Sequence, residues 1–268
     1  MRMVDIHNHL IYKFDDGPQT LEECLEMLKI AIDQGITDVF ATSHFNELIP
    51  QEIEDEYFEK LNILRSEALS RNLNIFIYSG SEIFFHHFID KTIKKGKVTT
   101  LANLGQYSLM EFPLFMMPNG IEEALFKLSM EHIIPIIAHP ERYQSVLEKP
   151  QRVYSFIKYG GLLQVNAGSV LGEFGKDVQK IAMWLLDEKL VHFIGSDAHT
   201  TKGRTFKMRE VSKYLKKYLD ADYLRDILEW NGRNIIHEVA MNPVSLTENG
   251  EQSPGILKKF RKKFRSGP

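Results

Sequence analysis

Short apolar runs rich in β-branched residues alternate along this chain with longer amphipathic stretches. The apolar positions predict seven strands, at residues 3–9, 37–43, 74–80, 107–112, 133–139, 161–166 and 191–196. Most segments between them have apolar residues at helical spacing. Because this alternation continues without a break in composition, it predicts one parallel α/β barrel in which helices connect successive strands.

The predicted helices have recognisable ends. Thr20 followed by Leu-Glu-Glu is typical of a capping box, and Gly35 is typical of a residue just past a helix end, so we predict a helix at 20–34. Further helices are predicted at 52–71, 119–132, 150–159, 176–189 and 222–239. Residues 245–255 are polar with Gly and Pro. We therefore expect a barrel domain at 1–244, followed by a flexible linker and basic tail at 245–268.

Composition and charge narrow the class of protein. The 268 residues, 43% of them hydrophobic, suffice for one full-sized core. The chain lacks a long apolar run, and its single cysteine, Cys24, cannot form an internal disulfide, so we expect a soluble protein of the cytoplasm. The net charge is −3, but residues 258–265 carry six basic side chains and no acid. The acidic remainder predicts no specific binding of nucleic acid, whose affinity comes from neutralised phosphates.

Imidazole and carboxylate side chains lie where six of the seven predicted strands end. In a parallel barrel these ends meet at one face, so we expect the side chains to converge. Two aspartates, Asp15 and Asp16, lie in the loop after the first strand and can reach the same face. The strand-end candidates are His7, His9, His44, Glu82, Glu111, His139, Asp197 and His199.

These side chains predict a metal site with more than one ion. His7 and His9 are two residues apart on a strand, so both can bind one ion. The remaining donors exceed what one ion can use, so we expect two or three. Imidazole and carboxylate without thiolate suit Mn²⁺, Fe or Zn²⁺. Metals about 3.5–4 Å apart can share a hydroxide and polarise a phosphoryl oxygen, which indicates hydrolysis of a phosphate ester.

Two arginines are candidates for binding the phosphate. Arg142 lies three residues past His139, and Arg204 lies five past His199. Planar guanidinium groups make bidentate contacts to phosphate. The alternative is a surface salt bridge, for Arg142 with Glu141. Covalent catalysis has little support, because Cys24 falls in a predicted helix and the chain contains no phosphate loop or G-x-S-x-G motif.

Several motifs together resemble a known family. DIHNHL, DDGPQTLEE, ATSH, GSEI, AHPERY, QVNAGS and GSDAHT occur in order between about residues 3 and 240. They resemble the polymerase-and-histidinol-phosphatase (PHP) superfamily and, more closely, the bacterial manganese-dependent protein-tyrosine phosphatases of capsule and exopolysaccharide control. The resemblance implies a distorted seven-stranded (β/α) barrel, TIM-like, with metals at the C-terminal strand ends. It also implies phosphotyrosine on a bacterial tyrosine kinase or its substrates as the target.

The resemblance further implies a role for each candidate residue. Mn²⁺ is the implied metal, with Fe, Zn or Mg as alternatives, and Arg142 and Arg204 match the phosphate-binding positions. A metal-bound hydroxide would attack phosphorus without a covalent intermediate. The second aspartate of Asp15-Asp16 is the implied ligand. The three implied ion sites consist of His7, His9, Glu82 and Asp197; of Asp16, His44 and His199; and of Glu82, Glu111 and His139, with Glu82 bridging.

Two surface features have alternative interpretations. The aromatic and thioether residues after Glu82 and Glu111 either form a rim that receives a tyrosyl ring or are ordinary packing. Ile256, Leu257, Phe260 and Phe264 fall at helical spacing among the six basic residues. This tail, residues 256–265, either binds an anionic membrane near a membrane-associated kinase or is a disordered solubilising segment. The rim residues are Phe84, Phe85, Phe88, Phe112, Phe115, Met116 and Met117.

Two other functions use the same pattern of residues. One is a histidinol-phosphate or other small-molecule phosphatase on the same barrel. The other is a regulatory barrel that binds a phosphoprotein without hydrolysis. The full set of ligand types favours an enzyme over the regulatory barrel.

Overall fold

The computed structural model describes residues 1–46 and 49–241, and in it seven parallel strands form one sheet in the order β1 to β7. Each strand pairs with the next one along the chain. The predicted seven-stranded parallel barrel is therefore confirmed. The strands are β1 (Met3–Asn8), β2 (Ile36–Phe45), β3 (Phe76–Phe84), β4 (Tyr107–Glu111), β5 (Ile134–Ala138), β6 (Leu162–Asn166) and β7 (Phe193–Gly195).

The barrel closes through the residues just beyond β7. Asn8 and Ala198 form a parallel bridge. The Asp197 N–H donates to the His7 carbonyl and the His9 N–H to the Ala198 carbonyl, both at 2.8 Å. Register shifts between β1 and β2 distort the barrel on the other side of β1. The two motifs from opposite ends of the chain, DIHNH and SDAH, are thus joined along the closing seam.

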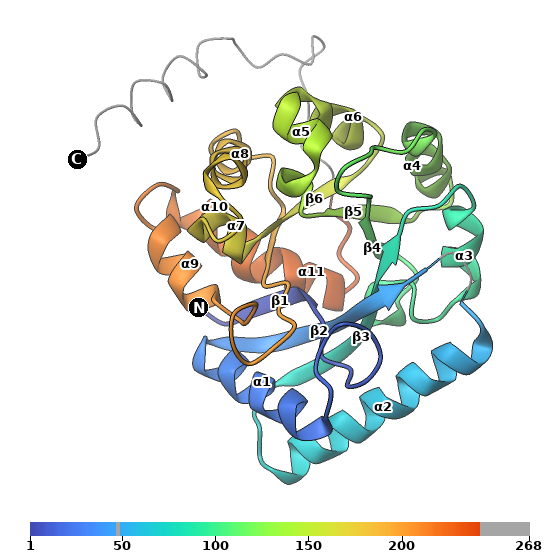
Figure 1. Ribbon diagram of the computed structural model, residues 1–268, viewed down its shortest axis with the longest axis vertical. Coiled ribbons are helices and arrows are strands. Elements are labelled where there is room, and N and C mark those ends of the chain that lie inside the picture. Colours follow the sequence, from blue (N-terminus) through green and yellow to red (C-terminus); the bar gives the residue numbers. More distant parts are fainter. Residues whose placement is uncertain (47–48, 242–268) are drawn as a thin grey trace.

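Helices cover the outside of the barrel, and α1 and α2 lie side by side outside β1–β3 (Figure 1). None of the helices among the described residues is both long and apolar enough to span a membrane. The helices are α1 (Leu21–Asp33), α2 (Gln51–Ser70), α3 (Ile89–Lys95), α4 (Ile121–Met130), α5 (Gln144–Glu148), α6 (Val153–Lys158), α7 (Ala167–Leu171), α8 (Lys176–Asp187), α9 (Met208–Leu215), α10 (Ala221–Arg225) and α11 (Asn231–Ile236), with short turns η1 (Leu101–Asn103), η2 (Pro140–Arg142), η3 (Pro150–Arg152) and the π-helical η4 (Asp226–Trp230).

The predicted start and end of α1 are observed. The Thr20 hydroxyl accepts from the Glu23 N–H at 3.2 Å. The Glu23 carboxylate accepts in turn from the N–H of Gln19, one residue earlier than a standard capping box requires. Gly35 follows the helix with φ of +85°, a conformation that favours glycine. Local side-chain chemistry therefore determines both ends of this helix.

Two helix predictions need correction. The region predicted as one helix at 222–239 is α10, η4 and α11 in succession, with a π-helical turn at Asp226–Trp230. Here α11 lies so close to β1 that a Cβ on Gly232 would be 2.5 Å from Val4 Cγ1, so packing on the barrel determines the path. The helix predicted at 150–159 begins with the 3₁₀ turn η3. Helices α3, α5, α7 and α9 were not predicted, and most are too short for a clear period.

The barrel interior is apolar toward the amino ends of the strands and polar at their carboxyl ends. A buried cluster inside the barrel includes Phe40, Leu109 and Leu162, while a larger one fills the space between strands and helices. Because side chains alternate along a strand, the inner face of β2 passes from Phe40 through Thr42 to His44. The apolar floor thus supports the polar side chains at the carboxyl ends of the strands.

The described chain ends at the other end of the barrel from these polar side chains. The hydroxyl of Tyr107, at the first residue of β4, donates to the Val239 carbonyl at 2.9 Å. It also accepts from the Met241 N–H at 2.8 Å. The predicted domain boundary at residue 244 and the predicted tail at 245–268 lie outside the described residues.

Candidate metal centre

All nine side chains predicted as metal ligands lie together at the carboxyl ends of the strands. In each of four overlapping groups, one nitrogen or oxygen per residue lies within 4.8 Å of the others. The overlaps make one continuous cluster. The groups are His9, Asp16, His44 and His199; His7, Glu82 and His139; His7, His9 and Asp197; and His44, Glu82 and Glu111.

Glu82 lies at the centre of this cluster. Its Oε2 atom is 3.1 Å from His7 Nε2, 3.5 Å from His9 Nε2 and 3.2 Å from His44 Nδ1. Its Oε1 atom is 3.1 Å from His139 Nε2. A carboxylate that faces four imidazoles is a candidate to be shared by two metal ions.

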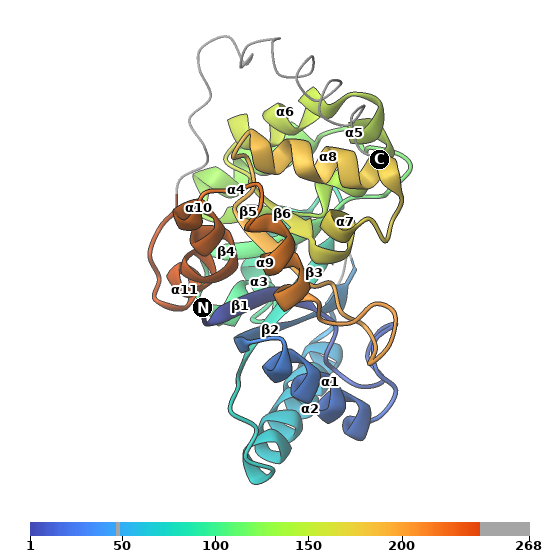
Figure 2. The same ribbon diagram turned by 90° about the vertical axis from the view of Figure 1, so that its left-hand side faces the viewer.

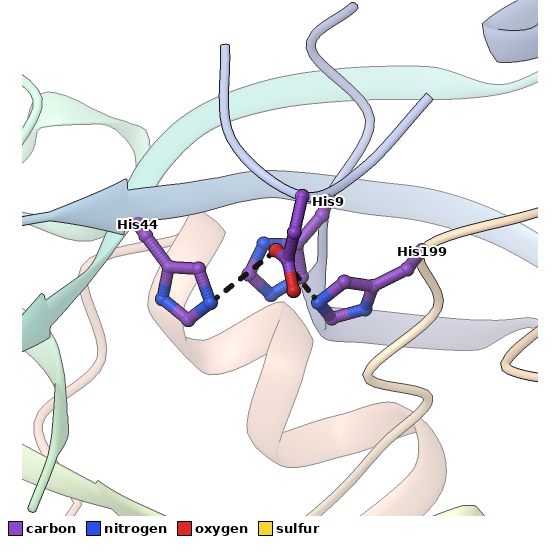
Figure 3. A group of neighbouring side chains, drawn as sticks. His9, His44 and His199 are labelled. Atoms are coloured by element: carbon purple, nitrogen blue, oxygen red, sulfur yellow. Dashed lines mark ion pairs between the residues drawn. The ribbon is translucent and has the colours of Figure 1, made fainter. Parts of the chain in front are cut away.

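One part of the cluster is open to solvent. His9, His44 and His199 point toward one another from the end of β1, from β2 and from the loop after β7 (Figure 3). The Asp16 carboxylate lies 3.2 Å from His199 Nε2 and 3.6 Å from His44 Nε2. Its side chain is 60% exposed, whereas that of Glu82 is buried. A substrate would therefore enter beside Asp16.

Unsatisfied nitrogens indicate that metal ions fit here. The Nε2 atoms of His7, His9 and His199 are buried. Carboxylate oxygens lie 3.1, 3.5 and 3.2 Å away, but no contact with the described residues has hydrogen-bond geometry. A buried polar atom without a partner costs free energy. Coordination to a cation would satisfy each nitrogen and offset the charge of the neighbouring carboxylates. The donors are nitrogen and oxygen without sulfur, which fits Mn²⁺, Fe or Zn²⁺.

Hydrogen bonds on the other ring nitrogens orient these imidazoles. His7 Nδ1 lies 2.8 Å from Gln164 Oε1, and His9 Nδ1 lies 2.8 Å from Asp15 Oδ2. His199 Nδ1 lies 2.9 Å from the carbonyl oxygen of Asp197, two residues earlier in the chain. A proton on each Nδ1 leaves the Nε2 lone pair directed at the cluster, which is the tautomer a ligand needs.

Asp15 orients the loop and its neighbours, whereas Asp16 lies among the candidate ligands. Besides His9, the Asp15 carboxylate accepts from the backbone N–H groups of His44 and Gly17, each at 2.9 Å. Burial acts to raise the pKa of Asp15, but the hydrogen bonds, chiefly from His9, lower it below its usual range. The ionised carboxylate is thus stable in this position.

Burial and neighbouring charges raise the pKa values of several candidate ligands, so these side chains hold protons when no cation is bound. Burial opposes the charge on His7, yet Glu82 and Asp197 raise its pKa to about 9. Burial also opposes the charge on His9, and Asp15 and Glu82 raise its pKa to about 10. Burial and the neighbouring Glu82 raise the pKa of Glu111 to about 8. Metal ions must therefore displace protons from this cluster.

Two candidate ligands have a left-handed backbone, which is unfavourable for residues with a side chain. The φ of His139 is +34° and that of Asp197 is +53°. Such conformations cost roughly 1 kcal/mol or more, so the surrounding structure must hold these residues in place. In both cases the backbone turns sharply as the chain leaves a strand.

Both predicted phosphate-binding arginines contact Asp197. Arg142 Nη1 donates to Asp197 Oδ2 at 3.1 Å, and Arg204 Nη2 donates to Oδ1 at 2.7 Å. The buried Arg204 Nε has no hydrogen-bond partner among the described residues. The alternative of a surface pair with Glu141 is wrong, because Glu141 is buried and accepts from the Asn166 N–H at 3.0 Å. The two guanidinium groups thus flank the cluster.

Three residues of the site were missed from the sequence. Gln164 and Asn166 face inward on β6, where Asn166 Nδ2 donates to Asp197 Oδ2 at 2.7 Å. Asp5 accepts from the Ser196 hydroxyl at 2.6 Å and from its N–H at 2.8 Å, across the barrel seam. The available signal was two polar residues at alternate positions of an apolar strand, a pattern that places both on the interior face.

The aromatic and thioether side chains after Glu82 and Glu111 divide between the two interpretations. Phe85 and Phe112 are buried in the outer core, so for them the packing interpretation holds. Phe84 instead shares the inner face of β3 with Glu82, pairs in register with Glu111, and is 37% exposed. It therefore lies at the mouth of the cluster. Phe88, Phe115 and Met116 are exposed in the neighbouring loops, and Met117 packs against the core.

Comparison with known sequences shows similarity to one family and to relatives named as tyrosine-protein phosphatases. A family model described as capsular polysaccharide synthesis, CpsB/CapC, matches residues 3–237. The chain is 35% identical to a putative tyrosine-protein phosphatase, CapC, of Staphylococcus aureus, over 81% of this chain and 86% of that protein. It is 31% identical to the tyrosine-protein phosphatase YwqE of Bacillus subtilis, over 80% of this chain and 84% of that protein.

Comparison with solved structures agrees with the comparison of sequences. A chain from the crystal structures of Bacillus subtilis YwqE and Streptococcus pneumoniae CpsB, described as metal-dependent tyrosine phosphatases, matches with a TM-score of 0.84 and 28% identity, over 91% of this chain and all of that chain. Histidinol phosphate phosphatase of Lactococcus lactis matches with a TM-score of 0.50 and 14% identity, over 90% of this chain and 94% of that chain. The second likeness shows a shared fold alone.

Proposed function

The chain belongs to the CpsB/CapC family of capsular polysaccharide synthesis, and from this premise we propose that it is a metal-dependent protein-tyrosine phosphatase. The observation that carries the proposal is the cluster of five imidazoles and four carboxylates beside two arginines. Relatives named as tyrosine phosphatases match about four-fifths of the chain, so the predicted family is confirmed.

We assign the metal ligands as the sequence predicted. Two or three divalent ions would be held, with Mn²⁺ as the first candidate and Fe, Zn or Mg as alternatives. Such ions lower the pKa of water and neutralise phosphoryl oxygens. The central position of Glu82 supports its assignment as the bridging carboxylate. The assigned ligands are His7, His9, Asp16, His44, Glu82, Glu111, His139, Asp197 and His199.

The protein's own side chains would bind and orient the phosphate. Each guanidinium carries five N–H donors, and the contacts with Asp197 leave several of them for phosphate oxygens. Arg142 and Arg204 would bind the phosphate from one side of the cluster. Cys24 cannot act as a nucleophile, because it is buried in α1 and burial raises its pKa to about 12. Cys24 thus offers no covalent route, and we propose that the phosphoryl group passes directly to water.

We propose phosphotyrosine on a membrane-associated bacterial tyrosine kinase, or on its substrates, as the target. The tyrosyl ring would lie beside Phe84, which follows the candidate ligand Glu82 on the same face of β3. Regulation of capsular or exopolysaccharide synthesis is the process that the family indicates. The protein would act in the cytoplasm, and its basic tail at 256–265 would bind the anionic membrane surface near the kinase.

The proposal is tested by removing and restoring metal. After chelation, Mn²⁺, Mg²⁺, Fe²⁺ or Zn²⁺ is added back, and phosphate release is measured from a phosphotyrosyl peptide, a phosphoseryl peptide and histidinol phosphate. We expect activity only with metal, and fastest release from the phosphotyrosyl peptide. A preference for histidinol phosphate would instead support the small-molecule phosphatase.

A variant separates the enzyme from a regulatory barrel that only binds phosphoproteins. Asp197→Ala removes a candidate ligand that also contacts both arginines. We expect loss of metal binding together with loss of phosphate release. If metal uptake disappears while phosphate release is unchanged, the proposed function is wrong.

A further inference from the structure

Arg142 lies against an aromatic ring that belongs to none of the metal-ligand groups. Its guanidinium carbon Cζ lies 4.6 Å from the centroid of the Phe174 ring. At the same time its Nη1 donates to Asp197 Oδ2 at 3.1 Å. The Arg142 side chain is 17% exposed, compared with 38% for that of Arg204. Arg142 is therefore held both by a carboxylate at one nitrogen and by the ring near its guanidinium carbon.

Phe174 lies in the segment between α7 and α8, two helices that lie next to each other (Figure 2), and contacts within this region hold it in place. The N–H of the preceding residue, Glu173, donates to the Gly168 carbonyl of α7 at 2.9 Å. The Glu173 carboxylate forms an ion pair with Lys207. A Cβ on Gly168 would lie 3.0 Å from Phe174 Cε2, so the ring packs directly on the helix backbone. The ring is thus a supported surface for the guanidinium.

We propose that Phe174 is a positioning residue for the phosphate-binding guanidinium of Arg142, an inference that rests on the proposed phosphatase function. A free arginine side chain loses rotational freedom when it binds phosphate, which weakens binding. A cation held over an aromatic face has already lost much of that freedom. Phe174 therefore increases the affinity for phosphate without contacting it, and Arg204 has no aromatic ring within cation–π distance among the described residues.

The first test compares Phe174→Leu, which removes the ring, with Phe174→Tyr, which keeps it. Binding of inorganic phosphate to the metal-loaded protein is measured by calorimetry, together with kcat/KM for a phosphotyrosyl peptide. We expect Phe174→Leu to weaken phosphate binding about fivefold, which is the scale of a cation–π contact. Phe174→Tyr should bind phosphate as tightly as the wild-type protein. Phe126→Leu, which removes an exposed ring on α4, serves as the matched control and should change neither quantity.

A double-mutant cycle distinguishes positioning from a general structural role. Once Arg142→Ala has removed the guanidinium, Phe174→Leu should cause no further loss in kcat/KM. An equal loss in both backgrounds would overturn the inference, because the ring would then act independently of Arg142. Equal phosphate affinities of the wild-type protein and Phe174→Leu would overturn it as well.

The phosphate measurement also separates this inference from the proposed function. If the wild-type protein fails to hydrolyse the phosphotyrosyl peptide but Phe174→Leu weakens phosphate binding, the phosphatase assignment fails and the positioning role stands. If the wild-type protein is active and both phosphate affinity and kcat/KM are insensitive to the ring, the positioning role fails alone.

Discussion

At the scale of single residues, the hydrogen bond between Gln164 and His7 makes the candidate metal centre testable. Gln164 Oε1 lies 2.8 Å from His7 Nδ1, while its Nε2 donates to Asn166 Oδ1 at 2.8 Å. Gln164→Met keeps the length of the side chain but removes the acceptor, so His7 loses its preferred tautomer. We expect metal affinity to fall by about 10–100-fold, the usual effect of losing such a partner.

Metal titration of the apo-protein, followed by calorimetry, checks this prediction. Gln151→Met, at an exposed position in η3, is the matched control and should bind metal like the wild type. Unchanged metal affinity in Gln164→Met would show that the His7 tautomer does not depend on this hydrogen bond.

A second residue-scale prediction concerns the pH dependence of stability. Burial lowers the pKa of His192 to about 4, and its Nδ1 accepts from the Leu163 N–H at 3.2 Å. At pH values between about 4 and the ordinary histidine pKa of about 6.5, His192 binds a proton in the unfolded chain but not in the folded chain. The neutral ring therefore stabilises the fold above pH 6.5 or so, and that contribution is lost as the pH falls toward about 4.

His192→Asn should remove this pH dependence, because asparagine has no group that titrates in this range. Its side-chain oxygen can still accept from the Leu163 N–H, so the hydrogen bond is kept. Urea unfolding of both metal-free proteins is compared at several pH values. We expect the loss of unfolding free energy on acidification to be smaller in the variant, by up to about 3 kcal/mol. Parallel pH profiles for the two proteins would contradict the prediction.

Some residues of the candidate site could be predicted from the sequence alone, and others could not. The ligand-type side chains were predictable, because His7, Glu111 and His139 each fall at or next to the end of a strand and parallel strand ends converge. Their hydrogen-bond partners were not, because Gln164 reaches His7 across 157 positions of the chain. That contact depends on how the barrel closes, which no local pattern encodes.

At the scale of elements, β3 shows both the success and the limit of pattern reasoning. The strand was predicted at 74–80 but runs from Phe76 to Phe84, so Glu82 lies within it. Ser79, Gly80 and Ser81 have low strand propensity, yet all are buried and paired with β2. A Cβ on Gly80 would lie 2.8 Å from Leu101 Cδ2, so the small residue is needed at this contact. Tertiary pairing here overrides local propensity.

The two ends of β3 provide a matched test of the tyrosyl-ring site. Phe84 is at the end beside Glu111, and Phe76, 64% exposed, is at the opposite end. We expect Phe84→Ala to raise KM for a phosphotyrosyl peptide several-fold more than KM for a small alkyl phosphate, because only the peptide has a ring to pack. Phe76→Ala should change neither KM. A uniform effect of Phe84→Ala on both substrates would exclude a ring contact.

At the scale of the whole molecule, the barrel explains why motifs far apart in sequence form one site. Seven strands were predictable from alternation, and their order follows from the rule that successive strands pair. The closure between β1 and the residues after β7 was inferred only from chemistry, since both carried ligand-type side chains. The structure shows that the same residues also make the closing backbone hydrogen bonds. The contacts that close the barrel thus also bring the candidate ligands of the two chain ends together.

The last prediction concerns where the barrel would face if the basic tail binds a membrane. The described chain ends where the Tyr107 hydroxyl binds the backbone of Val239 and Met241, at the end of the barrel opposite the candidate metal ligands. If the tail holds this end of the barrel against an anionic surface, the candidate site stays open to a phosphoprotein. Six basic residues at about 1 kcal/mol each would suffice for binding, and salt would weaken it.

The full chain and a chain ending at Leu246 are compared by co-sedimentation with vesicles of phosphatidylserine and of phosphatidylcholine. We expect only the full chain to sediment, only with the anionic vesicles, and less of it as the salt concentration rises. Hydrolysis of a soluble phosphotyrosyl peptide should be the same for both chains, because the shortened chain keeps every candidate ligand and both arginines. Equal sedimentation of the two chains would assign any membrane binding to the barrel, and sedimentation of neither would favour a solubilising role for the tail.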